Sequence, residues 1–259
     1  MATPVHSGQS VAVIGAGLIG LSCALELADR DISVTLYEKS WPPRGASWAA
    51  AGMLAPAFEA VGVAGSHSEL YDLCAASARL WPEWAARLER RTGLSSGYHP
   101  GPSLAVALDQ DEADHLTAVE KTLAGAQSPP SNCTAKLSDI EPTLSDHVVS
   151  GLLLPSDGQA DNRLTLEALI EAVQSHPKIT IQIGSAPLKR LGDGLDHAGH
   201  DRTLLTAGWQ TGSVFVDDAG RDRDVRAFDP VLRQIEPIAG QMLSVAPIEK
   251  GPKMTIRAG

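Results

Sequence analysis

Residues 10–40, SVAVIGAGLIGLSCALELADRDISVTLYEKS, form the stretch that decides the fold. The apolar run 11–14 predicts a short buried strand, and from Leu18 onward apolar side chains recur at helical spacing. Residues 33–37 favour a second strand, which ends in Glu38. The stretch therefore predicts a strand, a glycine turn, a helix and a second strand that ends in an acid.

The glycine turn has the pattern GxGxxG, and each glycine has a physical task. Gly15 permits a tight turn, Gly17 lets the backbone approach a diphosphate, and Gly20 lets the helix pack closely on the strand. The helix N-terminus offers N–H groups and a partial positive charge to phosphates. Glu38 stands where an acid can accept hydrogen bonds from a ribose 2′-hydroxyl. The alternative is a glycine turn that binds no ligand, but such a turn has no need of a carboxylate at the end of the second strand.

The whole pattern therefore predicts a dinucleotide site. The acid favours a free 2′-hydroxyl, hence FAD or NAD over NADP. The residues inside the turn and directly after the acid complete the first candidate set, namely Ala16, Leu18, Ile19 and Lys39.

Composition excludes several other classes of protein. The chain has 259 residues, 43% of them hydrophobic, and a net charge of −10, which argues against nucleic acid and anionic membranes as partners. No apolar run has transmembrane length, and the residues before Ser10 carry no signal or transit pattern. Three widely spaced cysteines, Cys23, Cys74 and Cys133, indicate reduced thiols and a cytoplasmic protein without a metal site.

The remainder of the chain predicts alternating helices and strands. Residues 68–91 predict one long helix with an apolar stripe of Leu70, Leu73, Ser77, Leu80, Trp84 and Leu88. A second helix is expected at 109–123, and Asp161 and Asn162 are expected to cap a third. Strands are expected at 103–108, 148–154, 179–183 and 188–191. The charged segment 217–229 predicts a loop, and His197 and His200 a solvated turn instead of a metal pair.

Residues 45–53, GASWAAAGM, follow a proline-containing loop. From composition alone, this run is either a loop that approaches a ligand closely or the start of an alanine-rich helix. The run resembles the second flavin-contacting segment of the D-amino-acid-oxidase superfamily, and most of all that of the glycine oxidases of thiamine biosynthesis. The resemblance implies an α/β fold, in which an FAD-binding Rossmann-like (glutathione-reductase-like) domain is interleaved with an incomplete α+β substrate domain.

The resemblance also implies strands at 203–208 and 235–245 and further FAD contacts. In the run itself they are Ser47, Ala50, Ala51, Gly52 and Met53, and in later segments Leu188, Ala207, Gly208 and Trp209. The implied domain boundaries are residues 1–98 and 155–234 for the FAD-binding domain, and 99–154 and 235–259 for the substrate domain. Family members continue beyond the point that matches Gly259, so we expect this chain to resemble their N-terminal part only.

The activity that the resemblance implies is oxidation of glycine or a small amino acid or amine by FAD. The products are an oxo acid and ammonia, and oxygen yields hydrogen peroxide. No catalytic side chain is nominated. Two alternatives stay open: a related D-amino-acid or sarcosine dehydrogenase, and a non-catalytic FAD-binding fragment or subunit of a split enzyme. The expected partners are the amino acid, oxygen and, as open alternatives, a second copy or a complementing C-terminal chain.

Overall fold

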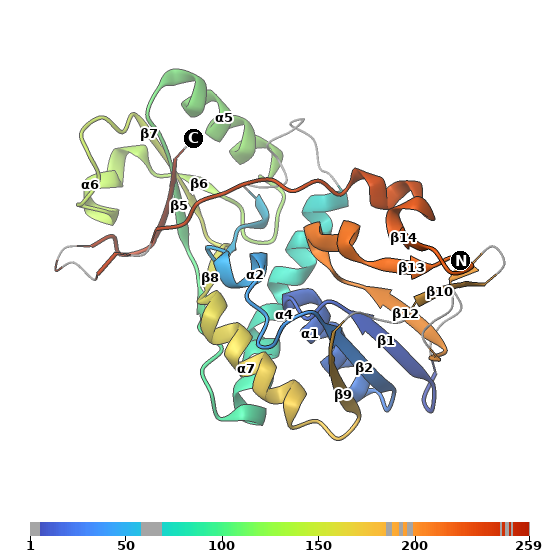
Figure 1. The fold of residues 1–259 in the computed structure, drawn as a ribbon. Coiled ribbons are helices and arrows are strands. Elements are labelled where there is room, and N and C mark those ends of the chain that lie inside the picture. Colours follow the sequence, from blue (N-terminus) through green and yellow to red (C-terminus); the bar gives the residue numbers. More distant parts are fainter. Residues whose placement is uncertain are drawn as a thin grey trace. The chain divides into compact units, whose positions relative to one another are not determined.

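The computed structural model (Figure 1) describes residues 6–57, 69–184, 188–191, 194–195, 199–243, 245–246, 249 and 251–258. The chain forms two compact units, each described here by itself. The first unit comprises Met1–Ala50, Arg90–Leu94 and Asn162–Met242, and the second Ala51–Glu89, Ser95–Asp161 and Leu243–Gly259. This division differs from the expected boundaries mainly in assigning residues 51–89 to the second unit.

A parallel sheet with the strand order β12-β1-β2-β9 organises the first unit. Its strands are β1 (Ser10–Ile14), β2 (Ser33–Glu38), β9 (Ile179–Ile183) and β12 (Arg202–Leu205). Helices α1 (Leu18–Asp29) and α7 (Asn162–Gln174) contact each other and the sheet. They bury apolar side chains such as Leu21 and Leu169 completely. The predicted order of strand, glycine turn, helix and strand is confirmed.

A second sheet of the first unit has the order β11-β10-β13-β14. Its strands are β10 (Leu188–Leu191), β11 (Gly194–Leu195), β13 (Phe215–Asp217) and β14 (Asp222–Asp224). Ala12, Ile14 and Tyr37 of the parallel sheet form a buried cluster with Leu188 and Val216. Because side chains alternate along a strand, one face of β1 supplies this cluster and leaves Val11 and Val13 for the opposite face.

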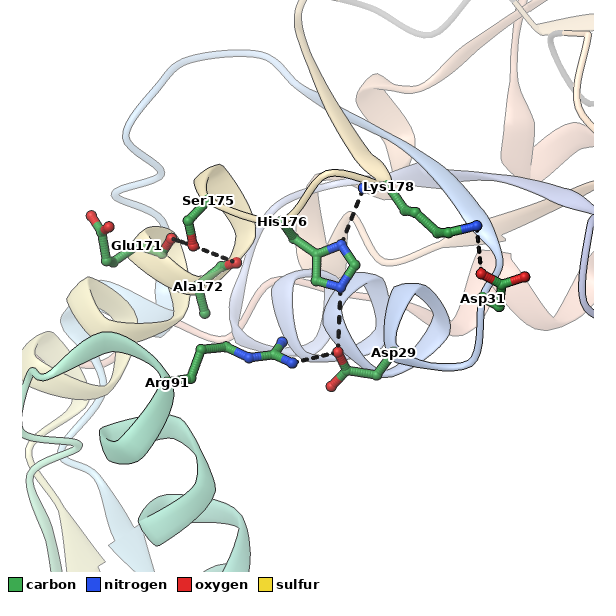
Figure 2. Close-up of polar contacts among 8 residues, drawn as sticks. All are labelled: Asp29, Asp31, Arg91, Glu171, Ala172, Ser175, His176 and Lys178. Atoms are coloured by element: carbon green, nitrogen blue, oxygen red, sulfur yellow. Dashed lines mark hydrogen bonds and ion pairs between the residues drawn. The ribbon is translucent and has the colours of Figure 1, made fainter.

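The C-terminal ends of three helices meet at a polar cluster in the first unit (Figure 2). Asp29 of α1 accepts a hydrogen bond of 2.6 Å from Arg91, in the last turn of α4 (Glu69–Thr92), and its carboxylate lies 3.3 Å from Nε2 of His176. The backbone N–H of Lys178 donates to Nδ1 of His176 at 3.2 Å. The ring proton of a neutral His176 therefore belongs on Nε2, where it donates to Asp29.

The second unit is built on a sheet with the order β15-β5-β7-β6. Its strands are β5 (Ser103–Ala107), β6 (Ser131–Asn132), β7 (Ser150–Leu154) and β15 (Thr255–Ala258). Ala105 and Ala107 pack with α5 (Gln110–Thr122), whereas Leu104 and Val106 pack with α6 (Leu137–Ile140), which follows the short helix η1 (Thr134–Lys136). A smaller sheet joins β3 (Met53–Leu54), β8 (Gly158–Ala160) and β4 (Tyr98–Pro100).

The helix expected at 68–91 is present as α4. Its predicted apolar stripe is right toward the C-terminus, where Leu88 is buried and Trp84 half-buried, but wrong toward the N-terminus. Leu70, Leu73 and Leu80 are 56%, 68% and 69% exposed. The inward face includes Trp81, whose ring stacks on Tyr98 at 5.8 Å and meets Trp84 edge-on at 4.9 Å. The buried side chains of this helix are Ala85 and Leu88, and the packed rings of Trp81 and Trp84 extend the same face.

The strand expected at 235–245 is also absent from the described residues. Residues 235–243 have no regular structure, and Ile238 and Leu243 are 95% and 90% exposed. A β-rich sequence becomes a strand only where a neighbouring strand supplies hydrogen-bond partners, and no described strand pairs with this segment.

The charged segment 217–229 is more ordered than expected. β14 pairs antiparallel with β13, and the short helices η3 (Val225–Ala227) and η4 (Pro230–Gln234) follow. The charges are satisfied locally, because Arg226 donates two hydrogen bonds to Asp224. His197 lies outside the described residues. His200 lies in a turn as expected, but it is half-buried and its ring meets Tyr37 edge-on.

Two absences hold for the described part of the chain. None of its helices combines the length and the apolar character needed to cross a bilayer. Its His, Cys, Asp and Glu side chains form no group of three that could hold a metal ion.

Candidate dinucleotide-binding site

A pocket of about 450 Å³ lies in the first unit, at the carboxyl ends of the strands of the parallel sheet. All four strand ends contribute: Gly15 follows β1, Glu38 ends β2, Gly184 follows β9 and Thr206 follows β12. Ligands of open α/β sheets bind at this edge, and the volume falls in the usual range for small-molecule pockets. The site that the glycine motif predicts thus coincides with a cavity.

The glycine turn accepts no side chain at its two ends. Gly15 has φ +102°, and an added Cβ would lie 2.7 Å from the carbonyl oxygen of Thr206. An added Cβ on Gly20 would lie 1.8 Å from the carbonyl oxygen of Gly15. Gly15 therefore makes the turn and Gly20 allows the helix to approach it, as the sequence predicts.

The middle glycine faces a different neighbour. An added Cβ on Gly17 would meet only the hydroxyl oxygen of Ser47, at 3.2 Å. The same hydroxyl accepts a hydrogen bond of 3.0 Å from the backbone N–H of Leu18, the first residue of α1. The first N–H groups of a helix have no intrahelical acceptor and can bind an anion. Ile19 lines the pocket, whereas Gly20 is buried behind the turn. Ser47 thus borders the turn at the point where a diphosphate would lie.

Glu38 has a structural task as well as a predicted binding task. Its carboxylate accepts hydrogen bonds from the backbone N–H of Ala16 at 2.8 Å and of Ser40 at 3.2 Å. The expectation that a structural turn does not need this acid is therefore wrong. The carboxylate both closes the glycine turn and lines the pocket, where its remaining lone pairs can accept from ribose hydroxyls.

The charges of the pocket suit an anionic ligand that carries hydroxyl groups. Its charged lining residues are Glu38, Lys39 and Arg44, two cations and one acid in a chain whose net charge is −10. The guanidinium of Arg44 lies 5.1 Å from the ring centre of Trp48. The guanidinium of Arg163 lies 5.5 Å from the same ring centre.

The run of small residues after β2 combines both forms that its composition allows. Residues Ala46–Ala49 form one turn of helix, α2, and the chain then continues in extended conformation at Ala50. Asn162, expected at the cap of α7, is its first helical residue. Its side-chain amide donates to the carbonyl oxygens of Ser47 at 3.0 Å and Trp48 at 2.6 Å.

Most of the predicted site residues line the pocket. They are Gly15, Gly17, Leu18, Ile19, Glu38, Lys39, Ser47, Ala207, Gly208 and Trp209. The last two begin the short helix η2 (Gly208–Ser213). Ala16 and Gly20 support the turn from behind, Ala50 lies outside the lining, and Leu188 is buried in the cluster with Val216. Ala51, Gly52 and Met53 belong to the second unit.

Sequence reasoning missed several lining residues. They include Pro43, Arg44, Gly45, Leu166, Gly184, Thr206, Gln210 and Phe215. The hydroxyl of Thr206 donates to the carbonyl oxygens of Ile14 at 3.0 Å and Gly15 at 2.7 Å, and so joins β12 to the glycine turn. Thr206 lies inside the strand expected at 203–208, but β12 ends at Leu205, so the sequence carried no signal that placed this residue at the carboxyl end of the strand.

Comparison with known proteins agrees with this geometry. The sequence pattern of the family described as "DAO: FAD dependent oxidoreductase" matches residues 10–258. The bifunctional protein ThiO/ThiG of Trichormus variabilis is 29% identical over 96% of this chain and 36% of its own length. Glycine oxidase of Geobacillus kaustophilus is 33% identical over 64% of this chain and 43% of its own length.

The solved structure of glycine oxidase from Geobacillus kaustophilus superposes with a TM-score of 0.68 and 27% identity. The match covers 77% of this chain and 56% of that one, so the chain spans less than two thirds of each of these relatives. The family pattern matches almost the whole chain, which shows that the chain belongs to the FAD-dependent oxidoreductase family named DAO.

Proposed function

We propose that the pocket of the first unit binds FAD, with the diphosphate at the N-terminus of α1 and an adenosine ribose at Glu38. The observation that carries this proposal is the cradle itself: Gly15 and Gly17 lie in the lining of a pocket of about 450 Å³. A Cβ on Gly17 would protrude toward Ser47 and fill part of the space that the phosphates need. Bound FAD supplies an acceptor for two electrons from an amine.

The residues of this chain hold and orient the cofactor. The N–H group of Ile19 and the hydroxyl of Ser47 serve the phosphates, and Lys39 and Arg44 contribute positive charge. Ala207, Gly208 and Trp209 line the pocket beyond β12, where the resemblance to relatives expects the flavin ring. Trp209 is 52% exposed, as suits a residue that a flat apolar ligand covers.

The proposed reaction of the whole protein is oxidative deamination of glycine or a small amino acid or amine. One amino acid, one water and one oxygen molecule give one oxo acid, one ammonia and one hydrogen peroxide. Support comes from the glycine oxidases among the relatives. The ThiO/ThiG relative supports a role in thiamine biosynthesis. Since the chain spans only part of these proteins, substrate and partners are proposed for the whole protein.

The test is peroxide formation by the flavin-loaded protein in air. We expect glycine or a small D-amino acid to give peroxide in step with ammonia, and sarcosine to give peroxide in step with methylamine. Amine-dependent bleaching of the flavin without peroxide would instead assign the protein to the dehydrogenases, which pass electrons to another acceptor. If the FAD-loaded whole protein is not reduced by any of these amines, the proposed substrate class is wrong.

A further inference from the structure

A single amide group joins the start of α7 to the segment that borders the glycine turn. Nδ2 of Asn162 lies 3.0 Å from the carbonyl oxygen of Ser47 and 2.6 Å from that of Trp48. These carbonyls belong to α2, whose four residues are too few to satisfy its own C-terminal carbonyls. The two N–H groups of one side chain, 114 residues away, therefore complete the end of this helix.

The same short helix presents its other side to the pocket. The hydroxyl of Ser47 accepts the N–H of Leu18 and lies where a Cβ on Gly17 would begin. Any shift of α2 thus moves this hydroxyl relative to the glycine turn and to the N-terminus of α1. The position of a ligand-binding group depends on how α2 is held.

The residue after Asn162 strengthens the attachment. The guanidinium of Arg163 lies 5.5 Å from the ring centre of Trp48, and Arg44, which lines the pocket, lies 5.1 Å from the same ring centre. Cations at this distance from an indole ring are attracted to it. Two successive residues of α7 therefore hold α2, one through its carbonyls and one through its tryptophan.

We propose that Asn162 is a positioning residue for the cofactor. Its amide fixes the end of α2 and thereby holds the Ser47 hydroxyl over the N-terminus of α1, in the place that receives the diphosphate. The inference rests on the proposed binding of FAD and adds to it a residue outside the pocket lining.

Replacement of Asn162 by aspartate separates this role from simple support of α7. An acid in the first turn of a helix is favourable, so a residue that only supports α7 tolerates Asn162→Asp. A positioning residue does not tolerate it, because a carboxylate cannot donate to the Ser47 and Trp48 carbonyls and repels them. Asn132→Asp is the matched control, because Asn132 uses its side-chain oxygen, which aspartate retains, to accept from the N–H of Thr134.

The experiment is titration of the cofactor-free chain with FAD, together with thermal unfolding of each cofactor-free variant. We expect Asn162→Asp to raise the Kd for FAD about tenfold, because α2 no longer holds the Ser47 hydroxyl at the glycine turn. The favourable charge at the start of α7 offsets part of the stability lost with the two hydrogen bonds, so the melting temperature should fall only slightly. Asn132→Asp should leave the Kd unchanged. If Asn162→Asp does not yield folded protein, Asn162→Ala removes the donors without adding charge and should weaken FAD binding in the same direction.

A double variant tests whether the effect passes through Ser47. Ser47→Ala alone should weaken FAD, and Asn162→Asp should add less than twofold in the Ser47→Ala background. Wild-type affinity in both Asn162 variants, or full additivity in the double variant, would overturn the positioning role and leave FAD binding intact. Failure of the wild-type chain to bind FAD would overturn the proposed function and this inference with it.

Discussion

At the scale of single residues, the three glycines of the turn are required for different reasons. A Cβ on Gly20 would collide with backbone at 1.8 Å, whereas a Cβ on Gly17 would meet only a serine hydroxyl at 3.2 Å. Backbone atoms in a packed turn cannot yield, but a hydroxyl can rotate. The two positions should therefore separate folding from binding.

We predict that Gly20→Ala lowers the free energy of unfolding by about 3 kcal/mol or more, because the turn must open to admit the methyl group. Gly17→Val should remain folded but should lose FAD, because the side chain enters the space of the diphosphate. Urea unfolding and flavin content measure the two effects. Gly125→Ala is the control, because an added Cβ there meets nothing within 4 Å. Wild-type flavin content in Gly17→Val would contradict the assignment of the turn.

Glu38 should affect both binding and folding. Glu38→Ala removes the acceptor for ribose and also the acceptor for the N–H groups of Ala16 and Ser40. We predict that FAD binding weakens by about 1–3 kcal/mol and that the cofactor-free protein melts at a lower temperature. Isothermal titration and thermal unfolding check the two parts. An unchanged Kd with a lowered melting temperature would show that Glu38 serves the turn alone.

The roles of single residues could be predicted where they depend only on neighbouring residues in the sequence. The tasks of Gly15 and Gly20 follow from the motif, because backbone geometry alone dictates them. The contacts of Thr206 and Asn162 could not be predicted, because each joins segments more than 100 residues apart. Such contacts depend on the packing of whole elements, which a single sequence does not reveal.

At the scale of elements, Glu141 joins the end of α6 to the segment before β15. It is completely buried and accepts hydrogen bonds from the hydroxyl of Thr143 at 2.6 Å and the N–H of Lys253 at 2.7 Å. The Thr143 hydroxyl above all, and then the Lys253 N–H, hold the pKa of this carboxyl below its ordinary value of 4.5, against the opposing effect of burial.

A lowered pKa stabilises the fold wherever the acid would also be ionised in the unfolded chain. The contribution of Glu141 is therefore fully present above pH 4.5 and is lost as the pH falls through the lower, folded-state pKa. We predict that Glu141→Gln lowers the free energy of unfolding by about 1–3 kcal/mol at neutral pH, because the new amide faces the Lys253 N–H. The free energy of unfolding of this variant should also depend less on pH in the acid range. Unfolding curves across this pH range provide the measurement. The exposed Glu167→Gln is the control, and an unchanged acid slope in Glu141→Gln would contradict the prediction.

The elements were predictable where their partners are close in sequence or their pattern is strong. The strands, the helix and the turn from β1 to β2 were predicted. The burial of three leucines of the α4 stripe, Leu70, Leu73 and Leu80, and the strand at 235–245 were predicted wrongly. In α4 the inward face includes Trp81, which contacts Tyr98, and not these three leucines. For the strand expected at 235–245, no described strand supplies the hydrogen-bond partners that a strand requires.

At the scale of the whole molecule, the charge balance and the pocket point to the same class of ligand. The chain has a net charge of −10, yet the charged side chains that line the pocket are two cations and one acid. The family could be predicted because the glycine motif and the AAAGM run are local sequence. The substrate could not be predicted, because none of the motifs found in the sequence indicates a residue that binds it.

The central claim is that the pocket at the carboxyl ends of β1, β2, β9 and β12 binds FAD. The most direct measurement is titration of the folded, cofactor-free chain with FAD, followed by the change in flavin fluorescence, with NADP as the competitor. We predict saturable binding of one FAD per chain that NADP does not displace, because Glu38 repels a 2′-phosphate. A folded chain that leaves the flavin signal unchanged at every FAD concentration would contradict the account.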